Sequence, residues 1–300
     1  MTKPRPVEAG TTYLLTRRCA QRQFLLVPSE VTNQVVTYCL GIASERYDID
    51  VHAFCFMSTH YHIVATDLRG ELPEFMRWMN EFIAKSMNAR YGRWESFWAP
   101  QSYSAVKLLE RNDILAKIVY TLQNPVSAGL VATHEQWPGA CSRPEDMLGT
   151  VRTVERPKVF FRKDGALPAT ATLRLSAPPM LASPDATARF VCDVAGMLAQ
   201  AETIAKAKVV AEGRRFLGRK AVLVQRHTDF PRTHESRRKL NPRIACRDTW
   251  RRIEALGRLR AFYDAYREAW LRFRDGVHDV VFPEGTYWMT RYAGARYADG

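Results

Sequence analysis

The chain has 300 residues, of which 46% are hydrophobic and 25% charged, a composition typical of a globular protein with a packed core. Because no apolar run approaches the length of a bilayer span and residues 1–8 lack the core of a signal peptide, we expect a cytoplasmic protein without membrane contact. The six cysteines form no Cys-x-x-Cys pair, so the sequence indicates neither a disulfide framework nor a cysteine zinc site.

The net charge of +13 lies entirely in the C-terminal half. Residues 1–150 contain 15 basic and 15 acidic residues, whereas residues 151–300 contain 29 and 16. The excess is densest between residues 206 and 260, with 17 basic and 5 acidic residues. Such a density favours binding to phosphate backbones, although a solvated helix surface gives the same pattern.

Hydrophobic periodicity predicts strands and helices in the order β-α-β-β-α-β-α over the N-terminal half. Pro73 and Asn112-Asp113 supply start signals for the second and third helices. This order predicts an α+β fold with helices on one face of a mainly antiparallel, ferredoxin-like sheet. The expected elements are strand 11–18, helix 30–46, strand 50–57, strand 61–66, helix 72–85, strand 102–108 and helix 113–124.

The pattern changes after residue 139. Residues 141–183 are rich in Pro, Thr, Arg and Gly and predict a connector, and helical periodicity returns at 185–213 and 247–275. The aromatic residues of the second of these helices favour core packing over a platform for stacking bases. Residues 280–289 predict a strand and turn that dock back on the fold.

Two short motifs contain side chains capable of chemistry. His60 and His62 are one residue apart on a predicted strand, so both imidazoles point to one face and can bind one metal ion. Tyr120 and Asn124 are four residues apart in a helical pattern that we expect Pro125 to end, so they share a helix face. Taken singly, each motif is more often structural: a surface histidine pair, a core tyrosine, a helix stop.

Together, His60-Tyr61-His62 followed by Tyr120-Thr121-Leu122-Gln123-Asn124-Pro125 resembles the HUH single-tyrosine transposases. The sequence of residues 120–131 is most similar to that of the REP-associated tyrosine transposases. The resemblance covers residues 10–145, with one departure at Met57-Ser58-Thr59, where many relatives have Met-Pro-Asn. It implies a ferredoxin-like catalytic domain at 1–145, followed by the connector at 146–183 and a basic, mainly helical accessory region at 184–300 that we expect to bind DNA.

The resemblance also implies an activity: a metal-dependent endonuclease and strand transferase that cuts single-stranded DNA beside hairpins. Tyr120 would be the nucleophile, forming a covalent 5′-phosphotyrosine that conserves bond energy for rejoining. His60 and His62 would be metal ligands, and by spacing we hypothesise Asn124 as a third. Imidazole alone favours zinc or copper, but the family implies Mg²⁺ or Mn²⁺.

Basic residues supply candidate DNA contacts. Adjacent strand residues face opposite ways, so at most one of Arg17 and Arg18 is expected to reach the active face. The candidates in the C-terminal half are Arg214, Arg215, Arg219, Lys220, Arg237, Arg238 and Lys239. A DNA-binding protein of this kind would associate with the nucleoid.

Several alternatives stay open at this point. A replication initiator or relaxase uses the same chemistry, but relaxases generally have three histidines and an early tyrosine. A domesticated protein that binds DNA hairpins without cutting, or represses transcription, is the alternative from another class. Both a monomer and a homodimer are compatible with the family, and some members complete the site with the partner's tyrosine helix. A zinc site of His52, Cys55, His60 and His62 is disfavoured, because three-residue spacing places His52 and Cys55 on opposite strand faces.

Overall fold

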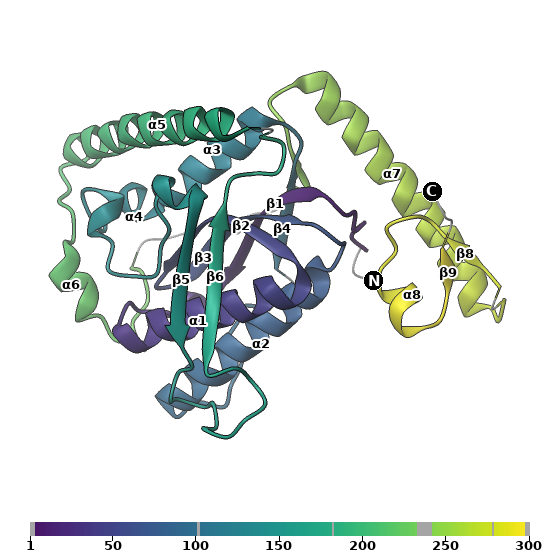
Figure 1. The fold of residues 1–300 in the computed structure, drawn as a ribbon, viewed down its shortest axis with the longest axis horizontal. Coiled ribbons are helices and arrows are strands. Elements are labelled where there is room, and N and C mark those ends of the chain that lie inside the picture. Colours follow the sequence, from purple (N-terminus) through teal and green to yellow (C-terminus); the bar gives the residue numbers. More distant parts are fainter. Residues whose placement is uncertain (1–3, 101–102, 182, 233–241, 278, 298–300) are drawn as a thin grey trace.

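The computed structural model describes residues 4–100, 103–181, 183–232, 242–277 and 279–297 (Figure 1). Its helices are α1 (Glu30–Tyr47), α2 (Leu72–Tyr91), α3 (Arg111–Leu122), α4 (Asn124–Ser127), α5 (Pro184–Ala211), α6 (Arg219–Leu223), α7 (Thr249–Arg274) and α8 (Trp288–Tyr292). Its strands are β1 (Thr11–Arg18), β2 (Ile49–Met57), β3 (His60–Asp67), β4 (Ser104–Leu108), β5 (Leu148–Glu155), β6 (Thr170–Ser176), β7 (Ile244–Ala245), β8 (Val281–Phe282) and β9 (Arg296–Tyr297). No helix among these residues combines the length and apolarity needed to cross a membrane.

A seven-stranded sheet forms the centre of the fold, in the order β5-β6-β2-β3-β1-β4-β7. The four central strands pair antiparallel, as expected, while β6 joins β2 and β7 joins β4 in parallel. The two short strands β8 and β9 pair with each other. The predicted α+β class with a mainly antiparallel sheet is confirmed.

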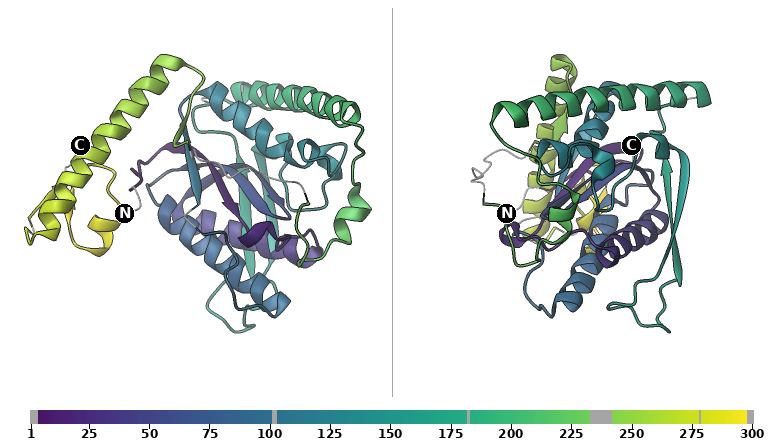
Figure 2. Two further views of the ribbon diagram at one scale, coloured as in Figure 1. Left: turned by 180° about the vertical axis from the view of Figure 1, so that it is seen from behind. Right: turned by 90° about the vertical axis from the view of Figure 1, so that its left-hand side faces the viewer.

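Helices cover both faces of this sheet rather than one (Figures 1 and 2). On one face α1 and α2 pack on residues such as Leu15, Phe54 and Ile63, which are fully buried. On the other face α3 and α5 pack on Leu14, Val64 and neighbouring residues. The sequence analysis predicted the helix that is α3 but placed it on the same face as the others, and it assigned α5 to a separate region beyond the expected connector.

That segment, residues 146–183, is built into the sheet. It contains β5 and β6, which pair antiparallel and add two strands at the edge next to β2. Ala171, Leu173 and Leu175 alternate along β6 and are buried in the same core as α1. The hairpin is therefore an integral layer of the fold, and the division of the chain into functional regions stays a prediction.

The C-terminal end docks back on the body of the molecule, as expected. The Tyr287 hydroxyl donates to Glu71 Oε2 at 2.7 Å at the start of α2, and Val7 N–H donates to Gly285 O at 3.0 Å. The core that we expected from the aromatic residues of α7 forms only at the end of the helix, where Tyr266, Trp270 and Phe273 pack against the cluster of the buried Phe282. Within α7 Ala269 alone is buried, and Trp250 is 81% exposed, because only the last turns of the helix pack on β8.

Candidate functional site

The two histidines lie at the start of β3, directly after the Ser58-Thr59 turn that follows β2. Strand alternation directs His60 and His62 to the face that carries Val64 and α3, while Tyr61 and Ile63 enter the core beneath α1 and α2. The imidazole centroids are 4.9 Å apart, with the rings nearly perpendicular. The structure therefore places both histidines on one face, as predicted.

Threonine hydroxyls contact both imidazoles at Nδ1. Thr16 Oγ1 lies 2.8 Å from His62 Nδ1, across the β1–β3 pairing, and Thr59 Oγ1 lies 2.8 Å from His60 Nδ1. A hydrogen bond at one ring nitrogen fixes the orientation of an imidazole, and in histidine metal sites the other ring nitrogen is the ligand atom. The sequence analysis missed these threonines, because the role of Thr16 depends on the strand register.

Tyr120 lies against this histidine pair. Its ring centroid is 5.1 Å from that of His62, at an interplanar angle of 71°. Helix α3 is held in this position because Ile114, Ile118 and Leu122 are fully buried between the sheet and α5. The half-buried Tyr120 projects from the edge of this contact. The fold thus brings together two motifs that are about sixty residues apart in the sequence.

The prediction that Pro125 ends the tyrosine helix is wrong in detail. Helix α3 ends at Leu122, and Asn124 and Pro125 open the short helix α4. Gln123 has αR backbone angles, and its N–H donates to Val119 O at 2.9 Å, so the helical hydrogen-bond pattern extends to Gln123. Pro125 is accommodated in the first turn of α4, where no intrahelical donor is required. Asn124 is half-buried one turn beyond Tyr120, and its role as a ligand stays a prediction.

Lys117 is a cation close to the tyrosine that we did not predict. Its Nζ lies 5.5 Å from the centroid of the Tyr120 ring. The two residues are three apart in α3, a spacing that places side chains on the same helix face. The spacing alone could have identified Lys117 as a neighbour. An ammonium group here can bind a phosphate oxygen.

The two arginines at the end of β1 point to opposite faces of the sheet. Arg18 is in register with His60 and therefore shares its face, whereas Arg17 is in register with the core residue Tyr61. The Arg17 guanidinium lies 6.0 Å from the centroid of the Trp98 ring, on the opposite side of the sheet. Of this pair, Arg18 is thus the residue placed toward the histidines.

Four of the C-terminal DNA-contact candidates belong to residues 213–230, which we call the basic strap. It follows α5 and bonds to the loop after α4, through Leu217 N–H to Gly129 O at 3.0 Å and Gly218 N–H to Leu130 O at 2.8 Å. Val222 is buried against Cys55 and Met57, which are in register with His62 and His60. The strap therefore passes beside the histidine pair.

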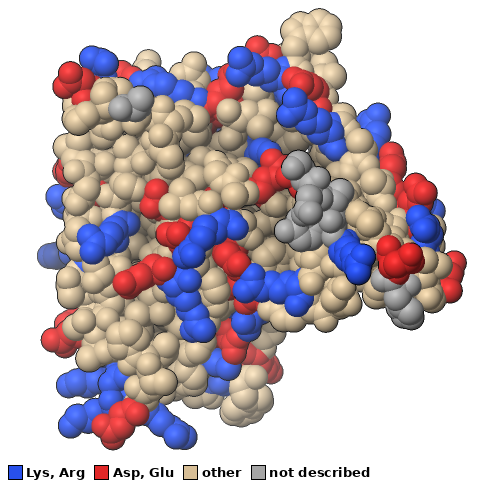
Figure 3. All heavy atoms as spheres, turned by 45° about the vertical axis from the view of Figure 1, so that its right-hand side comes forward, with Lys and Arg blue, Asp and Glu red and all other residues tan. Residues whose placement is uncertain are grey.

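The strap's basic residues differ in their surroundings. Arg215, Arg219 and Lys220 are exposed, while Arg214 pairs with Glu212 at 2.8 Å and contacts the position where Gly129 lacks a Cβ. Arg237, Arg238 and Lys239 lie outside the described residues. Figure 3 turns the right-hand side of Figure 1 forward, and on this face basic side chains are interspersed with acidic ones.

The alternative zinc site is excluded for a reason other than the one we gave. A β-bulge between Val51 and Ala53 turns His52 toward Thr66, on the same face as the histidine pair. Both its nitrogens are engaged, Nδ1 with Ser176 O at 2.9 Å and Nε2 with Thr66 Oγ1 at 2.7 Å. Burial lowers the pKa of His52 to about 4. His52 is therefore a neutral core residue.

Solved structures similar to this chain include two transposases. A REP-associated tyrosine transposase bound to a REP hairpin is 18% identical, with a TM-score of 0.39, covering 45% of this chain and 78% of that one. A candidate transposase from Deinococcus radiodurans R1 is 17% identical, with a TM-score of 0.29, covering 41% of this chain and 97% of that one. No protein-family model and no curated protein matches the sequence.

Proposed function

We propose that the protein is a divalent-metal-dependent endonuclease and strand transferase, a transposase that cuts single-stranded DNA beside hairpins. The observation that carries the proposal is the contact of Tyr120 with His62, whose neighbour His60 lies on the same strand face. A phenol, two imidazoles and the Lys117 ammonium in one place provide a nucleophile and positive charge, which phosphodiester cleavage requires. Single-stranded hairpin DNA as substrate follows from the family resemblance of the motifs.

The donor set fits a divalent ion. Metal–imidazole bonds are about 2.1 Å long, so two rings with centroids 4.9 Å apart can reach one ion through their Nε2 atoms. A bound Mg²⁺ or Mn²⁺ would neutralise the non-bridging oxygens of the scissile phosphate. His60, His62 and, by our hypothesis, Asn124 would hold it, with Thr16 and Thr59 orienting the two imidazoles.

In the proposed reaction Tyr120 Oη attacks the phosphorus atom. The bond from phosphorus to the 3′ oxygen of the upstream nucleotide breaks, that oxygen takes a proton from solvent, and the phenolic proton is lost to water. The downstream strand remains on the enzyme through a 5′-phosphotyrosine. Attack by another DNA 3′-hydroxyl reverses the step, regenerates Tyr120 and joins a new strand without ATP.

Intact-protein mass spectrometry tests this proposal. The protein is incubated with Mn²⁺ and hairpin-containing single-stranded DNA from the flanks of its own gene. We expect a DNA-sized mass increment for the natural chain and for Tyr47→Phe, a control at the half-buried end of α1, and none for Tyr120→Phe. Removal of divalent ions with a chelator should also abolish the increment.

The outcomes distinguish a DNA-cleaving enzyme from a protein that binds DNA without cutting it. An increment that persists in Tyr120→Phe would disprove the assignment of the nucleophile. Hairpin binding without any covalent product, in the presence of Mn²⁺ or Mg²⁺, would instead support a protein that binds DNA hairpins or represses transcription without cutting.

A further inference from the structure

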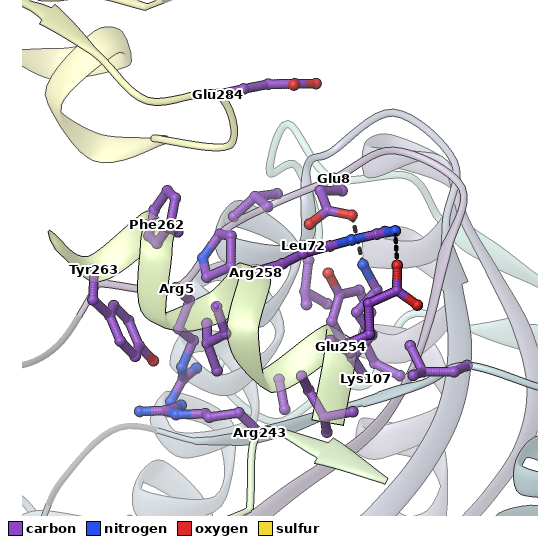
Figure 4. Close-up of a pocket in the computed structure, with 18 of the residues that line it drawn as sticks. Arg5, Glu8, Leu72, Lys107, Arg243, Glu254, Arg258, Phe262, Tyr263 and Glu284 are labelled. Atoms are coloured by element: carbon purple, nitrogen blue, oxygen red, sulfur yellow. Dashed lines mark hydrogen bonds and ion pairs between the residues drawn. The ribbon is translucent and has the colours of Figure 1, made fainter. Parts of the chain in front are cut away.

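A cavity of about 550 Å³ lies between α7 and the edge of the sheet at β4 and β7 (Figure 4). Its floor includes Tyr13 and Ala105, which face the α1 and α2 side of the sheet, whereas the histidine pair faces α3. It is therefore distinct from the site described above. The volume is in the range that binds small organic ligands, roughly 300–1,000 Å³.

Five basic side chains line this cavity, and three of them have acidic partners. Lys107 pairs with Glu8, Arg251 with Glu110 at 2.8 Å and Arg258 with Glu254 at 2.6 Å. The remaining two are Arg5 and Arg243. In Figure 4 their guanidinium groups lie next to each other, with the Tyr263 hydroxyl directed toward them and Glu284 far across the opening.

These two arginines lack a compensating carboxylate among the described residues. Arg5 donates to Tyr103 O, and its guanidinium carbon lies 4.1 Å from the centroid of the Tyr103 ring. Arg243 Nη1 is buried and has no hydrogen-bond partner in the described part of the chain. Burial lowers the pKa of Arg5, and the charge of Arg243 acts in the same direction. Two adjacent guanidinium groups, one of them with a buried donor that has no partner among the described residues, can bind a phosphate through parallel hydrogen bonds.

Aromatic rings extend the site beyond the size of a phosphate. Phe262 and Tyr263 of α7 and Tyr103 line the same cavity as the arginine pair. Phe262 is half-buried, so one part of its surface is open to a ligand. Flat aromatic side chains beside a phosphate site are the combination that proteins use to stack nucleotide bases.

We propose that this cavity binds a nucleoside phosphate, with the phosphate between Arg5 and Arg243 and the base against the α7 aromatics. The ligand is either a free nucleotide or one unit of a single-stranded nucleic acid, since both offer the same chemistry. The proposal goes beyond the cleavage activity and does not depend on it.

Isothermal titration calorimetry on the full chain carrying Tyr120→Phe tests this site without any covalent reaction. The probes are thymidine 5′-monophosphate, pentathymidylate and inorganic phosphate. We expect Arg243→Ala to weaken binding of both thymidine probes roughly tenfold, as for loss of a charge-assisted hydrogen bond, and Phe262→Ala to weaken it by a similar factor. Arg260→Ala removes the same charge from an exposed position of α7 outside the cavity and should change affinity less than twofold.

Each outcome decides the proposal. Equal losses in Arg243→Ala and Arg260→Ala would overturn it, as would inorganic phosphate binding as tightly as the nucleotide. If pentathymidylate binds more tightly than the monophosphate and depends on Arg243 to the same extent, the ligand is a nucleic-acid strand. If the two probes bind with equal affinity, the ligand is a free nucleotide. Arg243→Lys retains the charge without the planar fork and should give an intermediate affinity, which covers the case in which Arg243→Ala does not fold.

Discussion

The Thr16 hydroxyl is the contact through which β1 orients His62. An outer hydrogen bond of this kind typically changes metal affinity by 10–100-fold when it is removed. We therefore expect Thr16→Val to weaken Mn²⁺ binding by roughly this factor. Thr12→Val is the matched control, because Thr12 lies on the same face of the same strand and bonds to Thr66 Oγ1 at 2.8 Å, away from the histidine pair. Electron paramagnetic resonance titration of Mn²⁺ measures both; equal affinities would contradict the role of Thr16.

His52 makes the stability of the fold depend on pH. Its pKa is lowered to about 4 in the folded state by burial, against about 6.5 in the unfolded chain. As the pH falls, the unfolded state is therefore protonated at His52 before the folded state is. The fold loses stability as the pH falls from about 6.5 toward 4. Between pH 7 and pH 5 this amounts to about 2 kcal/mol.

Urea denaturation of the natural chain and of His52→Gln at pH 7 and pH 5 measures this contribution. The amide of glutamine can replace both hydrogen bonds without titrating. The free energy of unfolding should fall by about 2 kcal/mol more in the natural chain than in the variant. Parallel losses in the two proteins would show that His52 does not titrate as described.

At the scale of elements, helix α1 packs closely on strand β6 of the β5–β6 hairpin at Gly41. A Cβ at this position would lie 3.3 Å from Ala171 Cβ and from two backbone atoms of β6, whereas one at Gly196 of α5 would meet open space. We expect Gly41→Val to destabilise the fold by about 1–3 kcal/mol through overpacking. Gly196→Ala should instead stabilise it by about 0.5–1 kcal/mol through helix propensity. Thermal unfolding checks both; a stable Gly41→Val would mean that the hairpin can move away from α1.

The elements predictable from the sequence are those with strong local signals. Strand 11–18 was predicted with its observed bounds, and the helices at 30–46, 185–213 and 247–275 lie within two residues of the observed ends, because periodicity and capping residues define them. The alternation rule also placed His60 and His62 on one face. Three other features depend on strand register, which tertiary pairing determines. They are the choice between Arg17 and Arg18, the contact of Thr16 with His62, and the pairing of β6 with β2. The bulge at His52 inverted a face assignment for the same reason.

At the scale of the whole molecule, Glu71 joins the C-terminal segment to α2. It accepts hydrogen bonds from Tyr287 and Arg291, residues more than two hundred positions away in the sequence. We expect Glu71→Gln to weaken this docking and to increase hydrogen–deuterium exchange in residues 286–293, with exchange in β3 and α3 unchanged. Glu81→Gln is the control, since Glu81 lies within α2, of which Glu71 is the N-cap, and pairs with Arg77 and Lys85 of the same helix. Unchanged exchange in Glu71→Gln would show that other contacts hold the segment.

His62 and Tyr120 meet within one chain, and this has a consequence for how the proposed catalyst would respond to dilution. A site assembled from two subunits loses specific activity below the dissociation constant of the dimer, whereas one built on a single polypeptide does not. Mixing a chain that lacks His62 with one that lacks Tyr120 should likewise give no complementation. A single molecule of this protein arriving at a DNA strand would therefore carry every side chain that the proposed reaction requires.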